Sequence, residues 1–319
     1  MVRFEFSIAL HYEVGMPSDF LFNLHAAETS SQHVVAERVT SSTAHAPAVF
    51  RDPHFGNRLM RLKSDVGALD VLYHATVDVR HHLSDPTLID EVPVEKLPPE
   101  VLPYLWPSRY CQSDRIGAVA FREFAEIRKG YARVQAICRW VRQRTRFMPG
   151  TTHTATTAID TLTDLQGVCR DFAHLTIALC RSLNIPARFV SGIDYGADPA
   201  LGPVDFHAYV EAYLGDRWYL FDPTGISPTT GLLRIGTGRD AADVSFATSF
   251  GSVRSGPPTV TIQVIVDPAQ GLMAPVHTDA AVSTADASAL EPVLRLASST
   301  PEPLLAPATL RTAAARHYA

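Results

Sequence analysis

The chain has 319 residues, of which 46% are hydrophobic and 19% are charged, a composition typical of soluble globular proteins with a substantial core. This length favours two domains. The formal net charge of −5 argues against a nucleic-acid-binding protein, and the sequence has no run of 18 apolar residues that could cross a membrane.

The N-terminus and the cysteines favour a cytoplasmic location. Residues 1–6 alternate between apolar and polar side chains and lack the layout of a secretory signal. The cysteines have no CxxC spacing and are too few for a disulfide scaffold, so we expect reduced thiols. Of these, Cys138 and Cys180 lie on apolar helical stripes and should be buried, whereas Cys111 lies in a loop-like stretch that could be exposed.

The first hundred residues show the period-2 alternation of half-buried β-strands. Apolar side chains occupy every second position over residues 2–12, 20–24 and 69–79. Stretches rich in Ser, Pro, Asp and Gly separate these runs, and no convincing helix lies between them. We therefore predict an N-terminal domain over residues 1–97 that resembles an antiparallel β-sandwich.

After a Pro-rich connection the apolar pattern becomes helical. Val134, Ile137, Cys138 and Val141 form one stripe at helical spacing, and a strongly apolar helix is expected over residues 168–183. Strands are expected after it, at residues 188–193, 206–214, 217–221 and 260–266. Helices followed by strands indicate an α+β domain, which we place at residues 98–267.

The C-terminal residues 268–319 differ in composition from the rest of the chain. They are rich in Ala and Pro and have no sustained periodicity. We therefore predict a mostly disordered or loosely attached tail that buries little surface.

Cys169 follows Gly167 and Val168 at the expected start of the apolar helix. The first N–H groups of a helix are unpaired and carry partial positive charge, which stabilises a thiolate there. Asp171 lies in the first turn, where a carboxylate can cap the same helix end. Taken alone, Cys169 fits a nucleophile and a small buried hydrophobic residue equally well.

A thiolate nucleophile needs a base, and the base needs an orienting group. His207 lies on an expected strand that ends in the tight turn Gly215-Asp216, after which the chain returns toward Asp222. With a two-residue turn, Tyr209 lies opposite Asp222, and His207 becomes a diagonal neighbour of Asp222 on the same face. The spacing thus predicts an imidazole–carboxylate pair, the alternative being a histidine in an ordinary strand.

Three stretches resemble the motifs of one enzyme family. Residues 167–175 (GVCRDFAHL) resemble the nucleophile region of the transglutaminase-like superfamily, and residues 205–211 (DFHAYVE) and 218–224 (WYLFDPT) resemble its His and Asp motifs, in the family's order. Residues 238–244 resemble a stretch that follows the core in bacterial members. The N-terminal β region is similar, less distinctively, to the domain that precedes the core there.

The resemblance implies a papain-like, transglutaminase-like core of helices packed on an antiparallel sheet. It also implies that Cys169 is the nucleophile, His207 the base and Asp222 the residue that orients the base. Phe206 and Tyr209 occupy positions where many relatives have other residues, which bears on the substrate. An oxyanion donor besides the Cys169 amide is not identifiable in the sequence.

The chemistry that this triad implies is acyl transfer on a peptide or protein substrate. Hydrolysis by a cysteine peptidase or amidase is the leading interpretation, since water is always present as an acceptor. Protein crosslinking to a lysine is the second interpretation, and a non-catalytic binding module on the same fold is the third. We expect no cofactor, no metal ion, no nucleic acid and no membrane partner, and the oligomeric state is left open.

Overall fold

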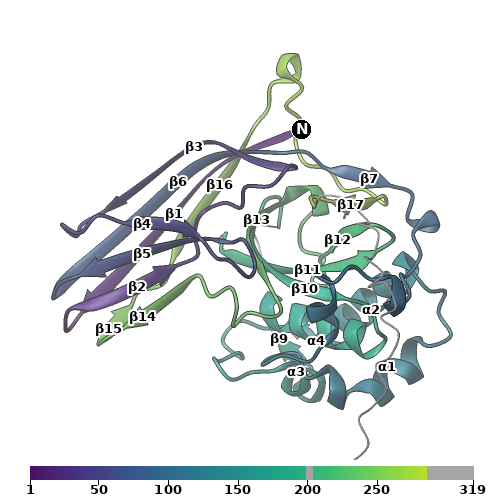
Figure 1. Ribbon diagram of the computed structural model, residues 1–319. Helices are drawn as coiled ribbons and strands as arrows, with labels where there is room; N and C mark the ends of the chain where they lie inside the picture. Colours follow the sequence, from purple (N-terminus) through teal and green to yellow (C-terminus); the bar gives the residue numbers. More distant parts are fainter. Residues whose placement is uncertain (199–203, 286–319) are drawn as a thin grey trace, which may run out of the picture. The chain divides into compact units, whose positions relative to one another are not determined.

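The computed structural model describes residues 1–198 and 204–285. All described residues belong to one compact unit, which spans residues 1–289. Two antiparallel sheets from the N-terminal region form a β-sandwich, and a third sheet carries the helices of the second region (Figure 1). The fold is therefore mixed α and β, as the alternation and the helical stripes predicted.

The sandwich is built from long amphipathic strands. In β1 (Val2–Val14) and β6 (Gly67–Val79) every second side chain is buried, and the two strands pair antiparallel along their whole length. The inward side chains of both sheets, among them Phe6, Met60 and Tyr73, share one apolar core. The remaining N-terminal strands are β2 (Ser18–Phe22), β3 (Gln32–Ser41), β4 (Ala48–Arg51) and β5 (Arg58–Ser64).

Three strands from near the C-terminus complete the sandwich. β15 (Val253–Ser255) and β16 (Thr259–Ile265) pair with β1, and β14 (Ala247–Phe250) pairs with β2. The predicted division at residue 97 assigned these strands to the catalytic region, and here the structure departs from it. Pairing partners more than 200 residues apart leave no local signal in the sequence.

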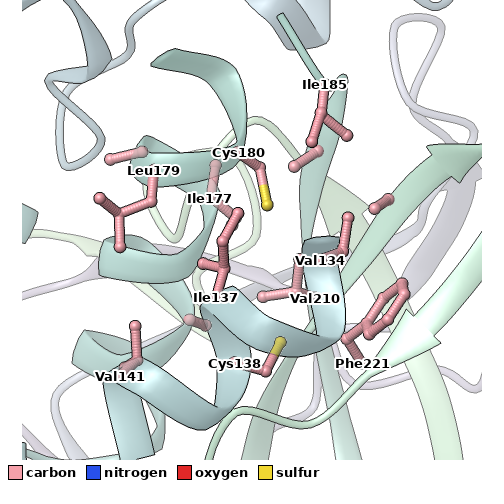
Figure 2. Close-up of a cluster of buried hydrophobic side chains, with 14 of the residues drawn as sticks. Val134, Ile137, Cys138, Val141, Ile177, Leu179, Cys180, Ile185, Val210 and Phe221 are labelled. Atoms are coloured by element: carbon pink, nitrogen blue, oxygen red, sulfur yellow. The ribbon is translucent and has the colours of Figure 1, made fainter. Parts of the chain in front are cut away.

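One helix of the second region packs on the sheet β12-β11-β10-β13, and three others pack around that helix. α2 (Tyr131–Arg144) and α4 (Cys169–Ser182) bury their apolar faces against each other and against β11, with Cys138 and Cys180 inside this cluster (Figure 2). The other helices are α1 (Gly117–Phe124) and α3 (Ala158–Asp164). The strands are β10 (Ala187–Asp194), β11 (Phe206–Leu214), β12 (Arg217–Phe221) and β13 (Leu232–Gly238), and the short β8 (Arg146–Phe147) and β9 (Gln166–Gly167) pair in parallel.

Two amide side chains from the sandwich bond to β13. Gln32 donates to the carbonyl of Arg234 and accepts from its N–H, at 2.7 and 2.9 Å. Asn57 makes the same pair of bonds to Thr237, both at 2.9 Å. A side-chain amide carries the same donor and acceptor as a peptide group. Gln32 and Asn57 therefore satisfy outward-facing hydrogen-bonding groups of the edge strand β13, although no further strand pairs with that edge within the described residues.

The predicted disordered tail is wrong for residues 268–285. The 3₁₀ helix η7 (Pro268–Gln270) follows β16, Leu272 is buried, and β17 (Ala281–Ser283) pairs with β7 (His82–Ser84). A strand of three residues is too short to show a period, which is why the sequence pattern missed it. Residues 286–319 lie outside the described residues.

Short 3₁₀ helices connect the two regions and the strands. They are η1 (Pro86–Leu88), η2 (Val94–Lys96), η3 (Leu102–Leu105), η4 (Ser113–Arg115) and η6 (Thr229–Gly231).

Candidate active site

Cys169 is the first residue of α4, as the sequence predicted. Asp171 caps this helix end, since its carboxylate accepts the N–H of Val168 at 2.9 Å and is fully buried. Gly167 makes the close approach feasible, because a Cβ at this position would lie only 2.7 Å from the Cβ of Asp171. Thr152 donates to the other oxygen of Asp171 at 3.1 Å, which fixes the carboxylate from the opposite side.

The β11–β12 hairpin has the predicted register. Leu214 pairs with Arg217 across the Gly215-Asp216 turn, and Val210 pairs with Phe221 near its open end. Gly215 has a φ of 59°, the left-handed conformation that this tight turn requires. The register therefore brings the beginning of β11 beside the residue that follows β12.

This register joins His207 to Asp222. The Nε2 atom of His207 lies 3.3 Å from Oδ2 of Asp222, and each side chain is only 2% exposed. The other oxygen of Asp222, Oδ1, accepts the N–H of Thr224 at 2.9 Å and its hydroxyl at 2.6 Å. Thr224 thus fixes the carboxylate so that its second oxygen faces the imidazole, a role that the sequence reasoning did not assign.

The charges of this pair reinforce each other. Burial alone would lower the pKa of His207, but the Asp222 carboxylate and the Cys169 side chain outweigh it and hold that pKa well above 6.5. Burial would raise the pKa of Asp222, but His207 and the two bonds from Thr224 lower it below its usual value. The site therefore favours an imidazolium and a carboxylate at neutral pH.

The thiol of Cys169 completes the group. Its interaction with His207 is one of the causes that raise the pKa of the imidazole. Because Nε2 of His207 faces Asp222, Nδ1 is the ring nitrogen left for the thiol. The Sγ atom lies 4.0 Å from the carbonyl oxygen of Phe206, the residue before His207. The structure thus brings the three predicted site residues together.

The other three thiols are shielded from solvent. Cys138 and Cys180 are buried between the helices, as expected. The loop-like setting of Cys111 suggested exposure, but this residue is fully buried, and burial raises its pKa to about 12. It packs in the same apolar cluster as α4, a long-range contact that the local sequence does not reveal. Cys169 alone among the four is partly exposed.

Phe206 and Tyr209 play different parts around the site. The ring of Phe206 is partly exposed and stacks on Phe246, with centroids 4.8 Å apart and planes 15° from parallel. Tyr209 is fully buried behind His207, in a small apolar cluster with Val282. Phe206 is therefore the one of the two that a substrate can contact. Phe246 was missed, since its neighbour in space is 40 residues away in the chain.

Residues 238–244 support the nucleophile helix from behind. The N–H of Ala241 donates to Nε2 of His174 on α4 at 3.2 Å, and Asp240 accepts the N–H of Tyr110 at 2.8 Å. The rings of His174 and Tyr110 stack with centroids 5.0 Å apart. Burial and two neighbouring arginines hold the pKa of His174 well below 6.5, so this imidazole stays neutral and accepts a bond. This stretch therefore has a structural role.

Metal-ligand clusters and membrane-spanning helices are both absent from residues 1–198 and 204–285. No three His, Cys, Asp or Glu side chains lie together as a metal ion would require. No helix in this part of the chain is long and apolar enough to span a membrane.

Comparison with known proteins finds the same two regions. The model of the transglutaminase-like superfamily matches residues 119–223, and that of the bacterial transglutaminase N-terminal domain matches residues 2–100. The crystal structure of a candidate cysteine protease from Cytophaga hutchinsonii superposes with a TM-score of 0.82. It is 37% identical, over 88% of this chain and 97% of that one.

Two curated relatives come from mycobacteria. An uncharacterized protein of Mycobacterium leprae is 32% identical over 168 residues, which is 51% of this chain and 59% of that protein. An uncharacterized protein of Mycobacterium tuberculosis is 29% identical over 136 residues, 39% of this chain and 43% of that protein. The chain thus spans about half the length of the curated relatives that it matches.

Proposed function

Because the chain belongs to the transglutaminase-like superfamily, we propose that it catalyses thiol-dependent acyl transfer on peptide or protein amides through Cys169, His207 and Asp222. The observation that carries this proposal is the buried contact of 3.3 Å between His207 and Asp222. The Cys169 thiol, the one cysteine that is partly exposed, interacts with the same imidazole. A neutral structural histidine would not need a buried carboxylate beside it.

The first half of the reaction forms a thioester. The thiolate of Cys169 attacks the carbonyl carbon of the amide at the N-terminus of α4, where the helix dipole carries partial positive charge. His207, as the imidazolium, gives its proton to the leaving amine nitrogen, and the C–N bond breaks. Asp222 keeps the ring oriented and stabilises its positive charge, as the orienting carboxylate of a triad does.

The second half transfers the acyl group from sulfur to an acceptor. In hydrolysis, the neutral His207 takes a proton from water as the oxygen attacks the thioester carbonyl, the C–S bond breaks, and release of the acid leaves the Cys169 thiolate beside the imidazolium. We propose this route, because water reaches any partly exposed thioester, and Cys169 is partly exposed. The candidate cysteine protease of Cytophaga hutchinsonii is consistent with the same route.

Mass spectrometry of a peptide library incubated with the chain tests the proposal, in the presence and absence of methylamine. We expect new peptide termini or deamidated side chains in both conditions. Incorporation of methylamine in preference to water would show that the second half of the reaction is amine transfer and not hydrolysis. No change in any peptide would favour a binding module instead.

Two variants assign the activity to the site. Cys169→Ser should abolish every product. Cys180→Ala, which removes a buried thiol near the far end of α4, should retain the products. Cytoplasmic location stays a prediction, and the four free cysteines are compatible with it.

A further inference from the structure

The edge strand β14 begins close to the candidate nucleophile. The carbonyl of Phe206 lies 4.0 Å from Sγ of Cys169, and the ring of Phe206 stacks on Phe246. Phe246 directly precedes β14, which then runs along the sandwich away from the helices (Figure 1). The stacked rings of Phe206 and Phe246 therefore connect the start of β14 to the surroundings of the Cys169 thiol.

β14 is the last strand of the sheet β14-β2-β5-β4. It pairs with β2 on one side, and within residues 1–198 and 204–285 no strand pairs with its other side. Thr248, Ser249 and Phe250 are exposed, and Phe250 is 61% exposed. An unpaired strand edge is a template for another extended chain.

The hydrogen bonds identify which groups face outward. The carbonyl of Phe246 accepts the N–H of Asn23, so this position is a hydrogen-bonded pair with β2. Such pairs alternate along an antiparallel ladder, so Thr248 and Phe250 also bond toward β2. The N–H and C=O groups of Ala247 and Ser249 consequently point away from the sheet, and the structure shows no partner for them within the described residues.

We infer that the outer edge of β14 binds an extended segment of the polypeptide substrate by main-chain hydrogen bonds to Ala247 and Ser249. An added strand uses its own N–H and C=O groups, which gives affinity with little dependence on sequence. Its course along β14 passes Phe246 and Phe206 and ends at the thiol, so the segment positions an adjoining amide at Cys169. The inference rests on the proposed function and names its substrate class, an unfolded or extended polypeptide.

Proline at position 249 tests this edge. Ser249→Pro removes an outward N–H and leaves the bonds to β2, and edge strands tolerate proline where the N–H faces solvent. The matched control is Val49→Pro on β4, the opposite edge of the same sheet. Asp52 donates to Asn57 there, so by the same alternation the N–H of Val49 also faces outward.

Both substitutions are made in the Cys169→Ala chain, and binding of fluorescein-labelled β-casein, an unfolded protein, is followed by fluorescence anisotropy. We expect Ser249→Pro to weaken binding about tenfold, from one lost hydrogen bond and the steric block of the ring. Val49→Pro should bind as its parent does. Equal affinities of all three chains, or equal losses in both proline variants, would overturn the inference.

A second measurement applies if Ser249→Pro lowers Tm by more than the control does. Peptides from β-casein, N-methylated at one backbone position each, compete with the labelled protein for the Cys169→Ala chain. Loss of competition at every second position supports strand pairing, and the absence of such alternation contradicts it.

These readouts separate the inference from the proposed function. Alternating binding without any turnover by the wild-type chain would support strand pairing at β14 and contradict the proposed catalytic function. Turnover of β-casein that Ser249→Pro does not alter would support the proposed catalytic function and contradict substrate binding at the edge of β14.

Discussion

The Nε2 atom of His207 and the Oδ2 atom of Asp222 are 3.3 Å apart, and each side chain is only 2% exposed. Two opposite charges buried at this distance are stable only while both are present, because either one alone would be an uncompensated buried charge. The same pair fixes the orientation of the imidazole toward Cys169. His207 and Asp222 therefore contribute both to the free energy of unfolding and to the proposed reaction, and each contribution can be measured.

Thr224→Val removes the hydroxyl that donates to Oδ1 of Asp222 and keeps the backbone N–H. The carboxylate then loses one of its two fixing bonds, so the population of imidazolium facing the thiol decreases. We expect kcat/KM to fall about tenfold with the pH profile displaced toward lower pH, because a less firmly held carboxylate raises the pKa of His207 less. Thr224→Ser, which keeps a hydroxyl, should restore most of the activity and the profile. An unchanged profile in Thr224→Val would show that Thr224 has only a structural role.

The pH dependence of stability follows from the two pKa shifts. The pKa of His207 is raised above 6.5, so its contribution is full below 6.5 and is lost as the pH rises through the folded value. The pKa of Asp222 is lowered below 3.8, so its contribution is present above 3.8 and is lost as the pH falls through the folded value. The pair therefore stabilises the chain most between pH 3.8 and 6.5, and part of the contribution of His207 is still present at neutral pH, below its raised pKa.

His207→Ala tests that range, since it leaves the Asp222 carboxylate buried and unpaired. We expect the free energy of unfolding to fall by about 3 kcal/mol at pH 7, and by less at pH 4, where the stranded carboxylate is more easily protonated. Urea unfolding at both pH values measures the difference. Asp216→Asn, which breaks a half-exposed pair with Arg217, is the control and should cost less than about 1 kcal/mol at either pH. A loss in His207→Ala that is independent of pH would argue against the charged pair.

The described part of the C-terminal segment should contribute to stability. Leu272, Ala281 and Val282 are buried, and Thr284 accepts a hydrogen bond from Arg234 at 3.0 Å. We expect a chain ending at residue 267 to melt several degrees below one ending at residue 289, because removal of buried aliphatic side chains costs roughly 1.5–3 kcal/mol each. Differential scanning calorimetry compares the two. Equal Tm values would mean that residues 268–289 add nothing to the core.

Local patterns predicted the site better than they predicted the sheets. The two-residue turn Gly215-Asp216 fixes the hairpin register, so the proximity of His207 and Asp222 could be foreseen from a short stretch of sequence. The helix start at Cys169 was equally local. By contrast, the pairing of β16 with β1 joins Ile265 to Arg3, and no short-range pattern encodes such a partner. The burial of Cys111 and the stacking of Phe246 on Phe206 depend on similar long-range contacts.

Cys169 should be the first thiol to react with a limiting amount of iodoacetamide at pH 6. It is the only partly exposed cysteine and faces an imidazolium, whereas burial raises the pKa of Cys111 to about 12 and holds that of Cys138 well above its usual value. Peptide mapping after the reaction locates the label. His207→Ala should slow labelling of Cys169 at pH 6 by about tenfold or more, since the stabilising cation is lost. Preferential labelling of Cys111, or an unchanged rate in His207→Ala, would indicate a structural cysteine.

The most direct test of the proposed chemistry is detection of the thioester itself. A library peptide that the chain modifies is mixed with it, the reaction is stopped in acid within the first turnover, and the protein is digested and mapped by mass spectrometry. We expect the mass of an acyl fragment of that peptide on the segment containing Cys169, removable by hydroxylamine and missing from Cys169→Ser. Product formation with no acyl group on Cys169 at any time point, or an equal yield of product from Cys169→Ser, would contradict covalent catalysis by this thiol.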